Sequence, residues 1–110
     1  MRELLRTEER AQANAVLCGM PLTEWQALPR RERKRRTDEG RIVAALREAG
    51  EMSGFPLIEA TGLGSGRLYI TLARMENGGR VVSRWADGPY PRRRLYRLPG
   101  APVKEETDRG

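Results

Sequence analysis

Hydrophobic residues recur at helical spacing through most of the chain and change to an alternating pattern towards its C-terminus. Apolar residues three and four positions apart share one face of a helix, whereas every second residue of a strand shares a face. The pattern predicts helices over residues 2–18, about 23–28, about 38–49, 55–61 and 65–77, and strands over residues 80–86 and 95–98. We therefore expect an α+β fold.

The stretch from Ile58 to Met75 has the pattern of two helices joined by a tight turn. Thr61-Gly62 is expected to end the first helix, because glycine readily takes the left-handed backbone found there. Leu63 then fills the angle between the helices, and Ser65 is expected to cap the second helix. The spacing turns one face of that helix towards a core, and this face consists of Leu68, Leu72 and Met75.

The opposite face of the second helix carries small, hydroxyl-bearing and arginine side chains. Its residues are Ser65, Gly66, Arg67, Tyr69, Ile70, Thr71 and Arg74. Such a face suits the major groove of DNA, with Arg67 as the best residue for contacting a guanine. A helical hairpin that binds no ligand would show the same pattern, so this stretch alone leaves both interpretations open.

The alternating pattern after Gly79 predicts a two-stranded hairpin with a basic tip, whereas Met52-Ser53-Gly54 is too short for more than one extended crossing. Arg92, Arg93 and Arg94 are consecutive, so on a strand they point to alternating faces and cannot all pair with acids on the core side. A DNA backbone or minor groove would supply the missing anion, with Arg84 as a further contact. Three helices followed by such a hairpin form a winged helix-turn-helix domain, expected over residues 37–100.

Residues 1–36 are expected to form an N-terminal helical extension with a basic segment. The helix over residues 2–18 either packs on its own domain or forms a homodimer through Leu4, Leu5, Ala11 and Ala15. Residues 30–36 contain six cations and one anion, which fits a solvated helix face, a linker or a phosphate-contacting arm. The arm would use Arg31, Lys34 and Arg35, and Thr37 or Asp38 would cap the next helix. Residues 101–110 are polar and are expected to be disordered.

Charge and composition narrow the function classes. The net charge of +6 comes mainly from arginine and favours a polyanionic partner. The chain has no histidine and one cysteine, which removes intrachain disulfides, the usual zinc sites and nucleophile–histidine pairs. Asp38-Glu39 is read as a pair of helix-start acids, so we expect no enzyme, no cofactor and no metal. Without a long apolar run or a signal sequence, the protein is expected to be cytoplasmic and not to bind membranes.

Several motifs occur in order between residues 41 and 98. They are Ser53-Gly54-Phe55, Ala60-Thr61-Gly62-Leu63, Ser65-Gly66-Arg67-Leu68-Tyr69, Leu72-Ala73-Arg74-Met75-Glu76-Asn77-Gly78-Gly79-Arg80-Val81 and Pro91-Arg92-Arg93-Arg94-Leu95-Tyr96-Arg97-Leu98. In these motifs the chain resembles the PadR-type winged-helix transcription regulators. The resemblance implies a dimeric, repressor-like protein that binds double-stranded DNA. The family generally has a dimerisation helix after the wing, whereas residues 99–110 are few and polar here, so the N-terminal helix is the expected dimer contact.

The sequence thus predicts a small sequence-specific DNA-binding regulator. Its DNA-binding residues would be Ser65, Gly66, Arg67, Tyr69, Thr71, Arg74, Arg84, Arg92, Arg93 and Arg94. An alternative is a winged-helix protein–protein adaptor, with Leu4, Leu5, Trp25 and Leu28 as its contact surface and the arginines binding an acidic partner. Single-strand or RNA binding is less favoured, because stacking on bases needs exposed aromatic residues and these make up only 5% of the chain.

Overall fold

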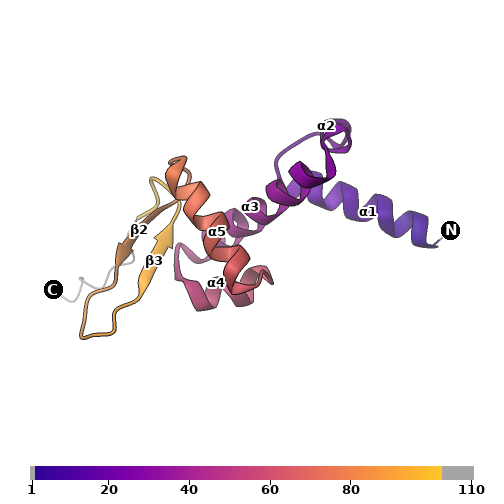
Figure 1. The fold of residues 1–110 in the computed structure, drawn as a ribbon. Coiled ribbons are helices and arrows are strands. Elements are labelled where there is room, and N and C mark those ends of the chain that lie inside the picture. Colours follow the sequence, from indigo (N-terminus) through magenta and orange to yellow (C-terminus); the bar gives the residue numbers. More distant parts are fainter. Residues whose placement is uncertain (1, 103–110) are drawn as a thin grey trace.

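The computed structural model of the protein describes residues 2–102, with side chains from residue 7 onward. This range forms α1 (Arg2–Leu17), α2 (Leu22–Ala27), α3 (Arg30–Ala49), β1 (Glu51–Ser53), α4 (Gly54–Thr61), α5 (Ser65–Asn77), β2 (Val82–Trp85) and β3 (Arg94–Arg97). The predicted α+β class is confirmed. The molecule is elongated, 57 × 27 × 26 Å, with α1 at one end and the β2–β3 loop (residues 86–93) at the other (Figure 1). Residues 103–110 of the predicted disordered tail lie outside the described range.

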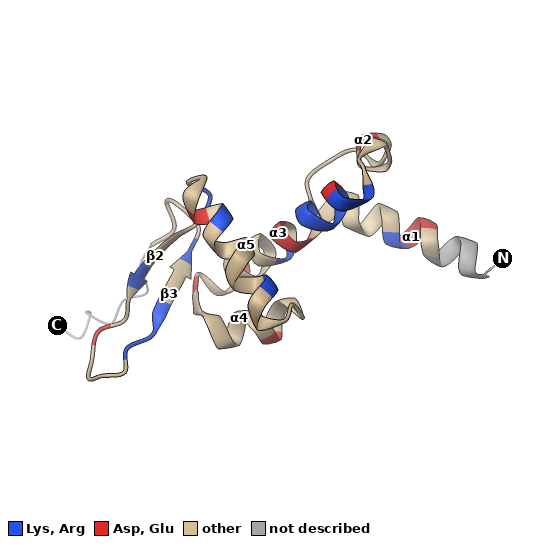
Figure 2. Cartoon of the chain, in the orientation of Figure 1, with Lys and Arg blue, Asp and Glu red and all other residues tan. Residues whose placement is uncertain are grey.

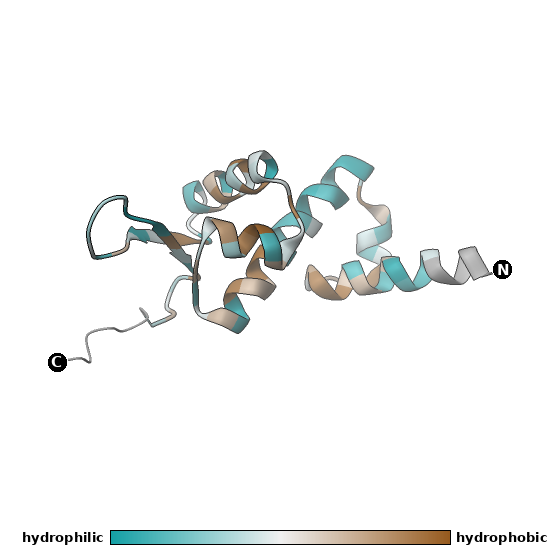
Figure 3. Ribbon diagram, turned by 90° about the horizontal axis from the view of Figure 1, so that it is seen from below, coloured by the Kyte–Doolittle hydropathy of each residue, from teal (hydrophilic) through white to brown (hydrophobic). Residues whose placement is uncertain are grey.

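The main core lies where α3, α4 and α5 meet one another and the sheet. Its buried residues are Ile42, Leu46, Leu57, Leu63, Leu68, Leu72, Met75, Val81 and Tyr96. The hydrophobic faces of these helices turn towards each other (Figure 3). Leu63 and the predicted inward face of α5 are at most 3% exposed, so their assignment to the core is confirmed.

The turn between α4 and α5 is built from side-chain and backbone hydrogen bonds. Gly62 has a φ of 75°, as predicted for the residue that ends the first helix. The Thr61 hydroxyl donates to the Leu57 carbonyl at 2.7 Å and accepts from the Leu63 N–H at 3.3 Å. The prediction that Ser65 caps α5 is wrong. Gly64 holds the cap position in an extended conformation, and Ser65 is already the first helical residue.

The sheet has three antiparallel strands in the order β1-β3-β2. The short segment before α4 forms β1, whose Met52 lies opposite Tyr96 of β3. Strand β3 also pairs with β2, with Val82 opposite Arg97. The predicted two-stranded hairpin is therefore extended by a third strand, because β3 offers its second edge to the residues that link α3 to α4.

α3 is one continuous helix of 20 residues, and it contains the whole basic segment 30–36. Pro29 precedes it, and the Thr37 hydroxyl donates to the Arg33 carbonyl at 2.8 Å instead of capping a helix. The predicted helix start at Thr37 or Asp38 is therefore wrong, and the expected boundary between residues 36 and 37 falls inside α3. None of the described helices has the length and apolar content required to cross a membrane.

α1 packs on both α2 and α3. Ala15 is 1% and Trp25 is 3% exposed, so both side chains are buried within the chain. α1 approaches α3 closely at Gly40, where a Cβ would lie 3.0 Å from Cγ of Leu17. Ala15 is therefore not available to the predicted dimer contact, nor Trp25 to the adaptor surface. Ala11 is half-buried, and the side chains of Leu4 and Leu5 lie outside the described residues.

Candidate nucleic-acid interface

α5 presents an exposed face on the side away from the core. Ser65, Gly66, Tyr69 and Ile70 all lie on this face. Thr71, which the sequence placed there, is only 2% exposed, and its hydroxyl donates to the Arg67 carbonyl at 2.7 Å. Thr71 occupies the border of the buried face and satisfies its hydroxyl within the helix, so it is not a surface residue.

Tyr69 is held in place by α4 while remaining 47% exposed. Its hydroxyl lies directly over Gly54, the first residue of α4, and a Cβ at position 54 would overlap it. The absence of a side chain at residue 54 therefore fixes how closely Tyr69 approaches α4. This contact positions the aromatic ring at the edge of the exposed face of α5.

Four of the arginines predicted to contact DNA form ion pairs with carboxylates from other elements. The N–O distances are 2.8 Å for Arg67–Asp38, 3.2 Å for Arg74–Glu39, 2.8 Å for Arg84–Glu51 and 3.4 Å for Arg94–Glu76. Asp38 and Glu39 lie in α3, Glu51 in β1 and Glu76 in α5. These pairs tie α5 and the sheet to the rest of the fold.

Glu39 lies between two arginines. It accepts from Arg80 at 2.7 Å and from Arg74 at 3.2 Å, and its side chain is 12% exposed. Burial alone would raise the pKa of Glu39, but the hydrogen bonds and charges of Arg80 and Arg74 together outweigh burial and lower it. The hydrogen bond to Glu39 in turn raises the pKa of Arg80. Glu39 is therefore ionised at neutral pH and joins α3 to the end of α5.

Arg94 lies at the base of the β2–β3 loop within a small polar cluster. Its Nε donates to the Ser83 hydroxyl at 3.0 Å, and that hydroxyl donates to Glu76 at 2.6 Å. The guanidinium also lies 5.4 Å from the ring centre of Trp85. These contacts hold Arg94 against the sheet, in contrast to its two neighbours in the loop.

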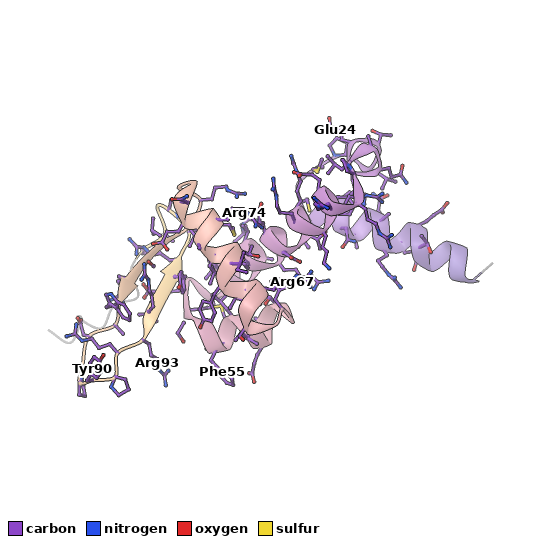
Figure 4. All side chains as sticks on the ribbon, in the orientation of Figure 1. Glu24, Phe55, Arg67, Arg74, Tyr90 and Arg93 are labelled. Carbon is purple, nitrogen blue, oxygen red and sulfur yellow. The ribbon has the colours of Figure 1, made fainter. Side chains whose placement is uncertain are left out.

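Arg92 and Arg93 are exposed, and neither forms an ion pair within the described part of the chain. Arg93 points away from the body of the molecule, and Tyr90 lies at the tip of the loop (Figure 4). Tyr90 is 89% exposed. The loop therefore projects two unpaired guanidiniums into solvent.

A second group of cations lies on α3 beside α5, and we call it the α3 stripe: Arg31, Lys34 and Arg35. These residues are three and four positions apart and share one helix face. They line a groove whose opposite wall is formed by Arg67, Ile70 and Arg74 of α5. Arg35 lies 3.4 Å from Glu32, whereas no ion pair is formed by Arg31 or Lys34 within residues 7–102. Lysine and arginine residues thus occur together on this part of α3 as well as on the strands (Figure 2).

The pairing carboxylates are the part of the site that sequence reasoning missed. Asp38 and Arg67 are 29 residues apart, and Glu51 and Arg84 are 33 apart, so no local spacing links them. Among the described residues no group of carboxylates and cysteine is arranged to hold a metal ion. The geometry brings together an exposed helix face, the exposed cations of the α3 stripe and of the β2–β3 loop, and a set of arginines fixed by carboxylates.

The chain was compared with protein-family models and with curated proteins. Neither protein-family models nor curated proteins gave a match to the chain. The resemblance to the PadR-type regulators therefore stays a prediction based on the motifs quoted above.

Proposed function

We propose that this protein is a small sequence-specific regulator of transcription, acting as a repressor on double-stranded DNA. In this proposal α4 and α5 form the helix-turn-helix, and α5 enters the major groove. The β2–β3 loop serves as the wing, and its arginines contact the backbone or the minor groove. Homodimer formation belongs to the same proposal.

The supporting observation is the charge arrangement around α5. The exposed face of α5 carries no acidic side chain except at its far end, where Glu76 is bonded to Ser83 and Arg94. The unpaired cations of the α3 stripe border this face, and those of the β2–β3 loop lie beyond the sheet. A helix in the major groove has a phosphate backbone on either side, so cations that flank the helix match that geometry.

The arginines then divide into two kinds. Arg92, Arg93, Arg31 and Lys34 would bind phosphates, because unpaired exposed cations release counterions from the DNA when they do so. Arg74, Arg84 and Arg94 hold the helices and strands in place through their carboxylates. Ser65, Gly66 and Tyr69 lie where α5 would meet the groove, and Arg67 would contact a base.

A salt titration of duplex binding tests the proposal. If Arg31, Lys34, Arg92 and Arg93 each neutralise one phosphate, the logarithm of the binding constant falls with the logarithm of salt concentration with a slope of about −4. Fluorescence anisotropy of a labelled mixed-sequence duplex measures this slope. A slope near zero, or no binding at low salt, would overturn the proposal. The adaptor alternative has less support, because the burial of Trp25 removes the aromatic residue of its contact surface.

A further inference from the structure

The pair between Arg67 and Asp38 differs from an ordinary surface ion pair. Nε of Arg67 donates to Oδ2 of Asp38 at 2.8 Å, and Nη2 donates to Oδ1 at 3.0 Å. The Asp38 side chain is 8% exposed, whereas that of Arg67 is 44% exposed. Arg67 lies on the side of α5 that faces α3 (Figure 4). The carboxylate is therefore buried and fixed, while the far side of the guanidinium is open to solvent.

A guanidinium group has two edges that can each donate two parallel hydrogen bonds. Asp38 occupies the inner edge, which consists of Nε and one hydrogen of Nη2. The outer edge, which consists of Nη1 and the second hydrogen of Nη2, has no partner in the described structure. Guanine presents O6 and N7 side by side in the major groove, and this pair of acceptors fits such an edge.

We infer that Asp38 is a positioning residue that fixes Arg67 so that its outer edge reads a guanine in the major groove. This inference rests on the proposed function. A free arginine on a surface helix samples many rotamers, and ordering it on binding costs free energy. Asp38 limits that cost by fixing the guanidinium before DNA arrives. The base recognised would be guanine. The discrimination between guanine and other bases would depend on Asp38, although Asp38 itself does not contact DNA.

The other ion pairs show why Arg67 is distinct. Arg84 is also held through Nε and Nη2, by Glu51, but it lies on β2 and its side chain is only 24% exposed. Arg74 lies on α5, but Glu39 holds it through a single contact and is shared with Arg80. On α5, Arg67 alone among the described residues combines a two-point hold with an open outer edge.

The test compares Asp38→Asn with Glu39→Gln. Both substitutions remove one negative charge from adjacent positions of α3, but only the first releases Arg67. A preferred duplex is first selected from a randomised library with the unaltered protein. Affinities are then measured for that duplex and for versions in which each guanine pair is replaced in turn by an adenine pair.

The unaltered protein is expected to discriminate one guanine from adenine by about 5- to 150-fold. Asn offers a single acceptor, so Asp38→Asn is expected to reduce that ratio to about threefold or less without weakening non-specific binding. Glu39→Gln is expected to keep the ratio. If Asp38→Asn keeps it too, the inference is overturned and the proposed function stands.

Arg67→Lys provides a second variant should Asp38→Asn unfold. Lysine keeps the positive charge, and with it the attraction to Asp38, but has no planar outer edge. This variant is expected to fold and to bind non-specific duplex as before. Its guanine preference is expected to fall, because an ammonium group bound to Asp38 cannot present two parallel donors to O6 and N7. Retained preference would overturn the inference. If the unaltered protein binds duplex DNA with no sequence preference, the inference is overturned but duplex binding stands. If it binds no duplex at all, the proposed function is overturned as well.

Discussion

Gly54 decides how closely α4 and α5 approach each other, because the Tyr69 hydroxyl occupies the space that a side chain at residue 54 would need. We expect Gly54→Ala to lower the free energy of unfolding by about 1–3 kcal/mol, the usual cost of overpacking. Urea denaturation followed by circular dichroism measures the change. Tyr69→Phe in the same chain removes the overlapping oxygen, so the double variant is expected to recover part of the loss.

Gly66→Ala serves as the matched control for that experiment. Gly66 is helical, and a Cβ there would meet nothing within 4 Å. Replacing glycine by alanine in such a helix stabilises by about 0.4–1 kcal/mol. A loss of stability at Gly66 similar to that at Gly54 would show that the Tyr69 contact is not the cause.

Glu39 makes the stability depend on acid pH. Its pKa in the folded protein lies below the ordinary value of 4.5, so ionised Glu39 stabilises the fold above that pH. The contribution is lost as the pH falls through the lowered pKa. We expect Glu39→Gln to reduce the free energy of unfolding by about 1 kcal/mol at pH 7, since Arg74 and Arg80 are partly exposed. The difference from the unaltered protein should shrink towards pH 3.

Urea unfolding at pH 7, 5 and 3 checks this prediction. Glu48→Gln is the control, because Glu48 lies in the same helix, is exposed and has no hydrogen-bond or ion-pair partner in the described structure. Its substitution should change stability by less than about 0.5 kcal/mol at every pH. A Glu39 variant that matches the Glu48 variant at pH 7 would contradict the assigned role.

Individual contacts were the hardest part to predict from the sequence. The inward face of α5 follows from periodicity, and Gly62 from its place after Thr61. The partner of Arg67 does not follow, because a contact over 29 residues depends on the angle at which α3 crosses α5. The exposure of Thr71 was mispredicted for a related reason. Helical position gives the direction of a side chain but not which neighbouring helix will cover it.

The helices and strands with a long periodic pattern were predicted from the sequence. The strand that forms only through hydrogen bonding to a neighbouring strand was not. α1, α5 and the β2–β3 hairpin have residues whose spacing or β-branched content identifies them. β1 has three residues and becomes a strand only because β3 offers an edge. α3 extends over its basic half because Pro29 starts it and the later turns continue it, although its charge pattern resembles a linker.

If the β2–β3 loop is a wing, its two unpaired arginines are expected to supply its contribution to DNA binding. The double substitution Arg92→Ala and Arg93→Ala is expected to weaken binding to all duplex sequences about equally and to reduce the magnitude of the salt slope by about 2. Anisotropy titrations at several salt concentrations measure both effects. Arg10→Ala combined with Arg47→Ala removes the same charge from exposed sites away from the loop. Equal losses in the two double variants would indicate that only net charge matters.

The two tryptophans lie in different parts of the molecule, one in the N-terminal helices and one in the sheet. Trp25 lies in α2, which packs on α1, and is buried outside the main core, whereas Trp85 lies on β2 and is 55% exposed. Few buried apolar side chains hold the N-terminal end, so it is expected to open before the main core. In urea, Trp25 fluorescence in a Trp85→Phe variant should change at lower concentration than Trp85 fluorescence in a Trp25→Phe variant. Coincident transitions would show that the two parts unfold as one unit.

The position of residues 30–36 at the start of α3 has an electrostatic consequence for that helix. The N-terminal end of a helix carries the positive pole of its macrodipole, and here six cations and a single acid occupy its first two turns. No side chain caps this end either. The positive charges of residues 30–36 therefore destabilise the first turns of α3. A bound polyanion would neutralise these charges and remove the destabilisation. Amide hydrogen exchange at residues 30–36 is therefore expected to slow when duplex DNA is added. DNA binding would then stabilise the same helical turns that contact the DNA.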